Sequence, residues 1–275
     1  MRTAMLGLLA EAPIHPGTGR GAGVVDLPVA REAATDYPVL VGSSLKGALK
    51  DKAERRIADR TDELFGKTDR AGDLLVSDAR LLLLPVRSLS GAYRWTTCPH
   101  LIERYARDRI RTGLEGPEAP GKIERGQVLT ADDTGGCCYL EERQFKVVGE
   151  PPDGLVNYIA PLVLHADTRA RLAGQIAILD DDDFAWFSRY GLAVQARNVL
   201  EKETKKSTGL WYEETLPPDT VMYALVVGRN DEALGALADL FPQQDPYLQA
   251  GGNETVGHGW FAVTLRGAPN GEGAA

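Results

Sequence analysis

The sequence predicts an α+β fold of ferredoxin-like type that is enlarged by insertions. Segments typical of strands and helices follow one another in the order strand, helix, two strands, helix and strand. The chain has 275 residues, of which 43% are hydrophobic and 25% are charged, as in an ordinary globular protein with a sizeable core. A third observation is the pair of strand-like arms with a polar tip at 192–217, which predicts a long β-hairpin whose tip is not buried.

The chain opens with a strand, a loop and a helix. Residues 3–10 are an apolar run that predicts a buried strand, and the glycine-rich segment 16–23 (PGTGRGAG) predicts a loop. A helix is expected over 44–60, because apolar residues recur there at helical spacing while charged residues fill the opposite face. Ser43 or Ser44 is the expected N-cap of this helix.

The middle of the chain adds strands, a helix and an insertion. Short apolar runs predict strands over 74–76 and 81–86, and a proline at the start of an amphipathic segment predicts a helix over 99–111. Residues 113–136 are rich in glycine, proline and charge, which favours an exposed insertion. Strand-like sequence returns at 137–148.

The last hundred residues complete the pattern. The expected elements are a helix over 169–179, the hairpin, a strand over 221–227, a helix over 231–241, a second glycine loop at 251–259 and a strand over 260–266. Residues 1–267 are therefore interpreted as a single domain, and 268–275 as a disordered tail.

Charge and cysteine usage restrict the function classes. The net charge is −8, with +2 on residues 1–60 and −10 on the rest, which argues against a free-standing nucleic-acid-binding protein. A subunit that shares its RNA with neighbours can nevertheless be acidic overall and basic along one groove. Three cysteines, two of them adjacent, give no disulfide framework and no zinc spacing, so a cytoplasmic location is expected. No segment approaches the length of a membrane span.

Asp26 is the first candidate for chemistry. It follows the glycine loop, where a carboxylate can take a proton from a 2′-hydroxyl or hold a divalent ion beside a phosphate. The alternative is that Asp26 only caps a turn, as most loop aspartates do. His15 flanks the same loop and can protonate a leaving oxygen or contact a phosphate, but a lone histidine is more often structural.

Two segments resemble phosphate-binding elements. Gly19 and Gly21 leave backbone amides open to an anion, although the loop lacks the spacing and the immediate helix of a dinucleotide fingerprint. Ser43, Ser44 and Lys46 combine a helix N-terminus with a cation, which suits a phosphate, but a well-capped helix with a solvated lysine is the commoner situation.

The hairpin is the other candidate. Basic residues interleave there with aromatic ones, as in proteins that stack on single-stranded bases, and the candidates are Arg197, Lys202, Lys205 and Trp211. Glu213 and Glu214 can supply a carboxylate near a phosphate that is to be cut. The second glycine loop, with Asn253, Glu254 and His258, can line the same groove or form a turn. A plain surface hairpin with a solvated tip is equally consistent with this sequence.

Four stretches spread along the chain resemble one family. They are 15–50, 85–99 (PVRSLSGAYRWTTCP), 210–219 (LWYEETLPPD) and 251–260 (GGNETVGHGW). The first contains Val-Val-Asp-Leu-Pro and Gly-Ser-Ser-Leu-Lys-Gly and is similar to the first conserved block of the RAMP superfamily of CRISPR proteins. The other stretches favour the target-RNA-cleaving backbone subunit of the type III-B (Cmr) complex over its type III-A relative.

The resemblance implies more than the residues do alone. It implies an RRM-type core, a thumb-like hairpin at 192–217, and copies of the chain that stack along a guide RNA with other Cmr-type subunits. It also implies divalent-metal-dependent cleavage of a single-stranded target RNA after this RNA has paired with the guide. Asp26 matches the family's essential aspartate. His15, Lys46 and one of Glu213 or Glu214, with Glu214 preferred, match positions where the family has active-site or RNA-contacting residues, and Lys46 belongs to the helix that meets the guide backbone. The alternatives are an inactive guide-binding scaffold and, from a different class, an enzyme that binds a phosphorylated ligand in the loop at 16–23.

Overall fold

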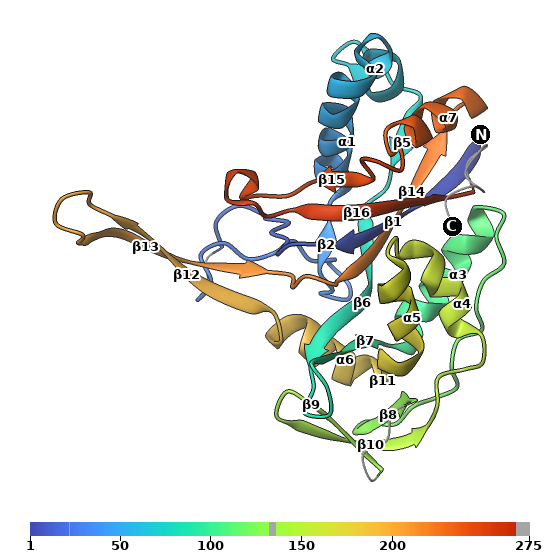
Figure 1. Ribbon diagram of the computed structural model, residues 1–275, viewed down its shortest axis with the longest axis vertical. Helices are drawn as coiled ribbons and strands as arrows, with labels where there is room; N and C mark the ends of the chain where they lie inside the picture. The colour runs from blue at the N-terminus through green and yellow to red at the C-terminus, as the bar shows by residue number, and fades with distance from the viewer. Residues whose placement is uncertain (22, 132–135, 268–275) are drawn as a thin grey trace.

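The structure is a computed structural model that describes residues 1–21, 23–131 and 136–267. Figure 1 shows a long mixed sheet with helices on both sides and one hairpin that projects away from it. The predicted α+β class is confirmed. Among the described residues, no helix is long and apolar enough to span a bilayer. The expected disordered tail at 268–275 lies outside the described residues.

Four antiparallel strands form the centre of the sheet, in the order β16–β1–β14–β6. They are β1 (Arg2–Ala10), β6 (Ala79–Arg87), β14 (Val221–Gly228) and β16 (Trp260–Arg266). In sequence, α1 (Gly42–Arg56) lies between β1 and β6, and α7 (Asp231–Asp239) lies between β14 and β16. The centre is thus two interleaved strand–helix–strand units. Short strands pair along it, namely β2 (Val39–Leu40), β5 (Leu74–Val76) and β15 (Tyr247–Gln249).

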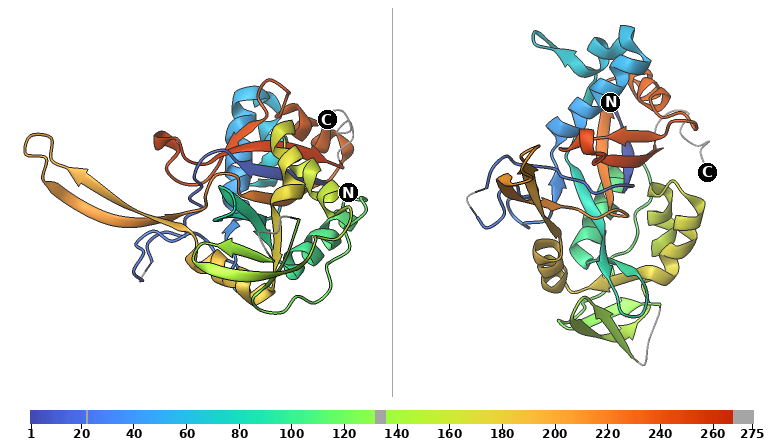
Figure 2. Two further views of the ribbon diagram at one scale, coloured as in Figure 1. Left: turned by 60° about the horizontal axis from the view of Figure 1, so that its bottom comes forward. Right: turned by 60° about the vertical axis from the view of Figure 1, so that its left-hand side comes forward.

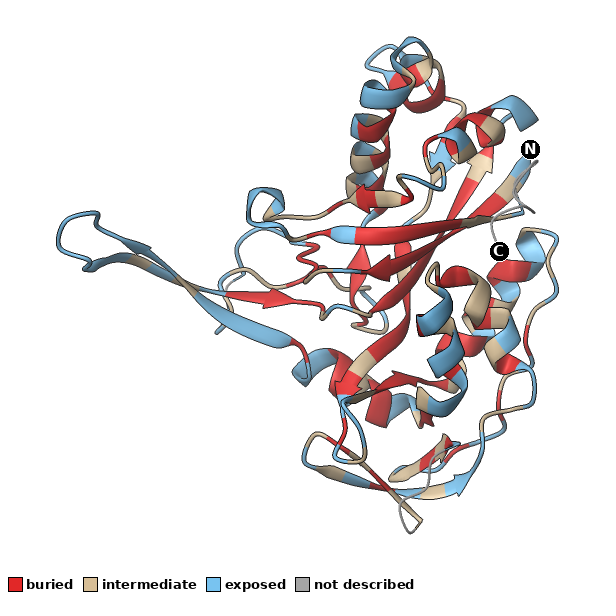
Figure 3. Ribbon diagram, viewed as in Figure 1, coloured by how far each residue is buried: buried red, intermediate tan, exposed pale blue. Residues whose placement is uncertain are grey.

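Both faces of the central strands are buried. Side chains alternate along a strand, so Leu6 and Leu8 of β1 join the core cluster that includes residues of α1 and α7. Met5 and Leu9 point the other way and join a second cluster with α3 (Pro99–Arg111), α4 (Leu155–Ile159) and α5 (Ala166–Gln175). A short 3₁₀ turn, Ala160–Leu162, continues α4. Figure 3 shows the buried residues concentrated along these strands.

The sheet continues beyond β6 into a smaller lobe, in the order β7–β11–β8–β10–β9. Its strands are β7 (Tyr93–Thr97), β8 (Gln127–Thr130), β9 (Cys137–Leu140), β10 (Arg143–Gly149) and β11 (Ile176–Leu179). The helix expected over 169–179 is therefore wrong at its end, because the chain leaves α5 and enters β11. All four β11 side chains, Ile-Ala-Ile-Leu, are buried, and such a short apolar run does not distinguish a strand from a helix.

The insertion expected to be exposed over 113–136 is partly inside the fold. Within it, β8 pairs with β10 on one side and with β11 on the other, and Ile123 and Val128 are buried. The prediction of an exposed insertion is wrong for this strand, because glycine and charge at its ends mask a short apolar segment. Residues 132–135 lie outside the described part of the chain.

The helix expected over 44–60 is two helices with a different N-cap. The chain breaks at Ile57, whose backbone is not helical (φ −139°), and α2 (Ala58–Phe65) follows. The N-cap of α1 is Val41, so neither Ser43 nor Ser44 caps it. Instead the Asp78 carboxylate, on the turn before β6, accepts the Gly42 N–H at 2.6 Å. The small hairpin β3 (Gly66–Lys67) and β4 (Arg70–Ala71) follows α2.

Asp78→Ala is expected to lower the free energy of unfolding by about 1 kcal/mol, because it removes the acceptor of a first-turn amide of α1. Ser43→Ala is the matched control and should change the stability little, because Ser43 is exposed and caps nothing. Urea unfolding of both variants measures the difference. Equal losses in the two variants would show that Asp78 does not act as the cap.

The predicted hairpin forms and stands apart from the main sheet. Its strands are β12 (Ala193–Leu200) and β13 (Ser207–Thr215), which form a two-stranded sheet separate from the main sheet. The hairpin is mostly exposed along its outer half and buried at its root, where Glu213–Thr215 lie. It is entered from α6 (Asp181–Tyr190), a helix whose N-cap Asp180 accepts the backbone N–H of Asp182 and Asp183.

Candidate functional site

The loop that carries Asp26 runs along the root of the hairpin. Ile14 and Leu216 exchange two backbone hydrogen bonds of 3.0 and 2.8 Å. Farther along, the Leu27 N–H donates to the Tyr212 carbonyl and the Glu214 N–H donates to the Leu27 carbonyl, both at 3.0 Å. The loop therefore adds to the edge of β13, which fixes its position relative to the hairpin.

Asp26 is exposed and has a defined orientation. Its Oδ2 accepts the Tyr212 N–H at 2.8 Å, and its backbone carbonyl accepts the Gly21 N–H at 2.8 Å. The Asp26 Oδ1 has no hydrogen-bond partner among the described residues. One carboxylate oxygen is thus anchored and the other is unpaired among the described residues, an arrangement that can accept a proton from a bound hydroxyl.

Glu214 lies directly behind this loop but is already fully paired. Its Oε2 accepts the Val29 N–H at 3.0 Å, and its Oε1 accepts a hydrogen bond from Arg31 at 2.9 Å. Arg31 also donates to the carbonyls of Asp36 and Ser188, both at 2.9 Å. Since Glu214 is buried and both its oxygens are occupied, its contacts are those of a residue that positions the loop.

His15 is a buried link between three segments. Its Nδ1 lies 2.8 Å from the Glu214 carbonyl, so Nδ1 carries a hydrogen, and its own carbonyl accepts the Gly252 N–H at 2.8 Å. A Cβ on Gly17 would lie only 2.6 Å from the His15 Nε2, so the loop requires glycine there. His15 is thus next to the strand that anchors Asp26, with 7% of its surface exposed.

A second polar cluster surrounds Glu213, the glutamate that was not preferred from the sequence. This carboxylate is 2% exposed, lies 3.5 Å from the Arg197 guanidinium and accepts a hydrogen bond from Asn253. Arg197 in turn lies 3.3 Å from the His258 Nε2. The structure therefore brings the second glycine loop to the hairpin root. Because side chains alternate along a strand, an exposed Tyr212 on β13 could have indicated that Glu213 points inward.

His258 is held in its neutral form. Because arginine can only donate, the His258 Nε2 is the acceptor, and burial together with the Arg197 cation lowers the pKa of His258. Below a pH of about 6.5 the unfolded chain then binds a proton that the folded chain does not, so stability falls as the pH falls.

The melting temperature of the wild type is therefore expected to fall more between pH 7.5 and 5.5 than that of His258→Gln, which lacks the titrating group. Thermal unfolding of both proteins at the two pH values measures this difference. Parallel falls would contradict the assignment.

Ser43, Ser44 and Lys46, which the sequence analysis groups as a phosphate site, lie in different surroundings in the structure. Lys46 lines a cavity of about 630 Å³ together with Lys67, Arg70 and Arg229. Ser44 lines a different cavity of about 340 Å³, which it shares with Gly251 of the second glycine loop. Ser43 is exposed. Ser44 and Lys46 thus line different cavities and do not form one cradle.

The remaining candidates lie along the loop and the hairpin. Gly19 has a φ of +90°, which favours glycine, whereas the Gly21 amide is already used by Asp26. Lys202 and Lys205 are exposed near the hairpin tip, far along the strands from Asp26. Trp211 is partly buried and pairs across the hairpin with Arg197.

The described residues do not build a metal site. No group of three or more histidine, cysteine, aspartate or glutamate side chains is arranged to hold an ion in that part of the chain. Asp26 offers one carboxylate oxygen that no described residue contacts by a hydrogen bond, while Glu213 and Glu214 are paired internally. An ion at Asp26 would have to take most of its ligands from phosphate oxygens and water.

Comparisons with known proteins converge on one group. Residues 8–262 match the RAMP superfamily. The chain is 32% identical, over 99% of both sequences, to the CRISPR system Cmr endoribonuclease Cmr4 of Pyrococcus furiosus. Its structure superposes on the crystal structure of oligomeric Cmr4 from P. furiosus with a TM-score of 0.76 and 27% identity, covering 96% and 98% of the two chains. A chain of a type III-B Cmr-beta complex bound to cognate target RNA has the same fold, with a TM-score of 0.75, 19% identity and coverage of 96% and 97%.

Proposed function

The chain belongs to the RAMP superfamily and is homologous to the Cmr endoribonuclease of P. furiosus, and from this premise we propose that it is the RNA-cleaving backbone subunit of a type III-B CRISPR complex. It would bind the guide RNA and cut the single-stranded target RNA paired with that guide. Because base pairing with the guide selects the target, the protein needs no base-specific contacts. Its partners would be further copies of itself and other Cmr-type RAMP subunits, in the cytoplasm.

The observation that carries the proposal is the geometry of Asp26. Its carboxylate is exposed at the junction of the loop and the hairpin, with one oxygen anchored by Tyr212 and the other without a hydrogen-bond partner among residues 1–21, 23–131 and 136–267. Cleavage of RNA by its own 2′-hydroxyl requires that this hydroxyl lose its proton and align with the adjacent phosphorus, while the leaving 5′-oxygen takes up a proton from solvent. Asp26 would accept this proton as general base. A divalent ion held by Asp26 would find no second free carboxylate among the described residues, so phosphate oxygens and water would have to complete its ligands.

Two finer features of the fold support the same proposal. The antiparallel order β16–β1–β14–β6, with α1 and α7 as crossovers, supports a ferredoxin-like core, in which the β12–β13 hairpin would be the thumb. Both faces of the core strands are covered, so bases would not stack on the sheet as they do on an RRM. RNA would instead follow the edge where the loop, the hairpin and the second glycine loop meet. Lys46, Ser43, Ser44 and the amides near Gly19 would then hold guide phosphates.

A specific observation also favours a second candidate, the scaffold without catalysis. The bond from the Tyr212 N–H to Asp26 is of the kind that a purely structural loop aspartate makes. In that case the chain would bind guide RNA with the same elements, and another subunit would cut the target.

Reconstitution of the complex with a defined guide tests the function. Labelled RNA complementary to the guide should be cut at regular intervals, once per copy of this chain, whereas a scrambled RNA of equal length should stay intact. The product ends separate the chemistries, since attack by the 2′-hydroxyl leaves a cyclic phosphate and attack by metal-bound water does not. Intact complementary RNA, with and without Mg²⁺ or Mn²⁺, would overturn the nuclease assignment and leave the scaffold.

A further inference from the structure

Arg20 lies in the loop that carries Asp26, and the site described above does not use it. It is exposed, and its guanidinium forms no ion pair or hydrogen bond with any residue that the structure describes. The next residue, Gly21, donates its N–H to the Asp26 carbonyl at 2.8 Å, so the loop closes on itself there. A cation and an anion thus leave the loop on the two sides of this closure.

Glycines fix the backbone on both sides of Arg20. Gly19 has a φ of +90°, a left-handed conformation that other residues rarely adopt. A Cβ on Gly21 would lie only 3.1 Å from the Pro28 ring, so the chain packs closely there against the residues that follow Asp26. The point where the Arg20 side chain leaves the loop is therefore set relative to Asp26, while its guanidinium stays available to a ligand.

Two arginines at the root of the hairpin are already occupied by buried carboxylates. Arg31 binds Glu214 at 2.9 Å. Arg197 lies 3.5 Å from Glu213. The Asp26 carboxylate, in contrast, accepts a backbone N–H and has no cationic partner in the described part of the chain. Its negative charge is therefore not balanced by the arginines that balance its two neighbours.

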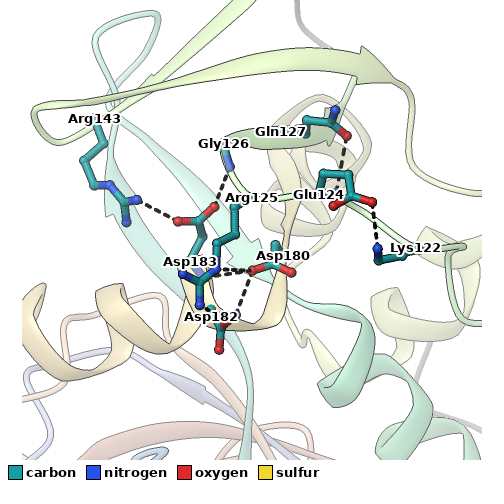
Figure 4. Close-up of polar contacts among 9 residues, drawn as sticks. All are labelled: Lys122, Glu124, Arg125, Gly126, Gln127, Arg143, Asp180, Asp182 and Asp183. Carbon is teal, nitrogen blue, oxygen red and sulfur yellow. Dashed lines mark hydrogen bonds and ion pairs between the residues drawn. The ribbon is translucent and has the colours of Figure 1, made fainter.

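The arginines at the start of α6 are occupied as well. Arg125 pairs with Asp182, and Arg143 donates to Asp183 at 2.6 Å (Figure 4). Both arginines come from the smaller lobe and hold it against the first turn of α6, which is acidic. Since their charges are offset there, they offer little attraction to a phosphate at the loop.

The lysines considered for RNA binding lie away from Asp26. Lys46 lines a cavity that contains no residue of the loop. Lys205 lies at the tip of the hairpin, and the stretch of β13 from Ser207 to Tyr212 alone spans roughly 17 Å at about 3.3 Å per residue. In both views of Figure 2 the loop lies beside the root of the hairpin. Arg20 is thus better placed than these lysines to act together with Asp26.

The reaction itself requires a positive group beside Asp26. An ionised carboxylate and an RNA phosphate are both negative and repel each other at short range. The phosphate also gains negative charge as the 2′-oxygen attacks it, and a fixed cation at that point lowers the barrier. A guanidinium suits this task, because it donates two parallel hydrogen bonds to phosphate oxygens and does not release its proton in proteins.

We propose that Arg20 is a second catalytic residue, which holds the phosphate to be cut beside Asp26 and stabilises the charge that develops on it. The inference rests on the proposed function, since it needs a target RNA that is cut at Asp26. Asp26 accepts the 2′-hydroxyl proton, the 2′-oxygen bonds to phosphorus, the bond from phosphorus to the 5′-oxygen breaks, and that oxygen takes a proton from solvent. Arg20 donates hydrogen bonds to the non-bridging oxygens throughout and transfers no proton.

Single-turnover cleavage in the reconstituted complex tests this role. Arg20→Gln should slow cleavage of end-labelled target about 10²-fold, the usual effect of removing one donor from a transition state, and should weaken target binding by no more than about threefold. Arg20→Lys should recover part of the lost rate, because lysine keeps the charge but lacks the planar fork. Arg107→Gln is the matched control, since Arg107 is an exposed arginine of α3 outside the loop, and it should cut at the wild-type rate.

Chemical rescue separates a catalytic role of Arg20 from a structural one. Guanidinium chloride, at millimolar concentrations that do not unfold the complex, should raise the cleavage rate of Arg20→Ala about tenfold, because the free ion can bind the same phosphate. The same additive should leave Asp26→Asn unchanged, since that variant lacks the base and not the cation. A slow Arg20→Ala complex that guanidinium does not rescue would overturn the catalytic role.

The cleavage and binding data also distinguish failure of this inference from failure of the proposed function. A rate for Arg20→Gln within about twofold of the wild type is far above the loss expected for a transition-state contact, so it would overturn the role of Arg20 alone. Equal losses of rate and affinity would show that Arg20 only binds RNA and would overturn its catalytic role as well. A wild-type complex that leaves complementary RNA intact would overturn the proposed function together with this inference.

Discussion

Asp26→Asn is expected to slow cleavage of target RNA about 10²- to 10⁴-fold in the reconstituted complex, the contribution typical of a positioned general base. Asparagine has the same shape, and its carbonyl can still accept the Tyr212 N–H that anchors the loop. The substitution therefore removes the basic carboxylate and keeps the loop in place. RNA affinity and the melting temperature should stay near those of the wild type.

The measurement is single-turnover cleavage of end-labelled target, with affinity measured by filter binding on the same preparations. Asp153→Asn is the matched control, because Asp153 is an exposed aspartate near α4 and outside the candidate site. A cleavage rate for Asp26→Asn within twofold of the wild type would leave Asp26 with a structural role and favour the scaffold. Loss of cleavage together with an equal loss of RNA affinity would show that Asp26 acts in RNA binding and not in the chemical step.

The elements that the sequence predicted well are those whose periodicity is long and uninterrupted. The strand at 3–10, the helix at 99–111 and the hairpin at 192–217 all form, because each carries its own signal in neighbouring residues. The helix over 169–179 failed at its end because β11 is four apolar residues long and fits either state. The predicted N-cap of α1 was wrong, because the acceptor of the first-turn amide, Asp78, is 36 residues away and belongs to another turn.

The same distinction between signals in neighbouring residues and contacts with distant residues applies to the candidate site. Its members could be identified as unusual residues from the sequence, but their partners could not, since His15 and Glu214 are 199 residues apart. The sequence favoured Glu214 over Glu213 as a catalytic carboxylate. The structure places both inside the protein, each with its own arginine, Arg31 for Glu214 and Arg197 for Glu213. These distant pairings decide which side chains are free to react. Of the three carboxylates, only Asp26 has an oxygen without a partner in the part of the chain that the structure describes.

The Arg31–Glu214 pair is the largest expected contribution to stability at the site. Both side chains are largely buried, at 16% and 9% exposure, so Arg31→Ala leaves a buried carboxylate with only the Val29 amide. Removing one partner of a buried ion pair costs about 3 kcal/mol or more. We expect the melting temperature of Arg31→Ala to fall by about 6–12 °C. Arg2→Ala breaks the exposed pair with Asp231 and should cost less than about 1 kcal/mol.

A double variant then separates the positioning role of Glu214 from a catalytic one. In Arg31→Met with Glu214→Gln no unpaired charge remains, and glutamine still accepts the Val29 N–H that holds the loop. If Glu214 only positions Asp26, the double variant should regain stability over Arg31→Ala and cut RNA, at a temperature where all variants are folded, within about tenfold of the wild type. If Glu214 takes part in the chemistry, cleavage should stay as low as in Glu214→Gln alone although stability recovers. The paired contacts of Glu214 favour the first result, because a carboxylate with both oxygens occupied cannot take a proton from RNA without first leaving Arg31.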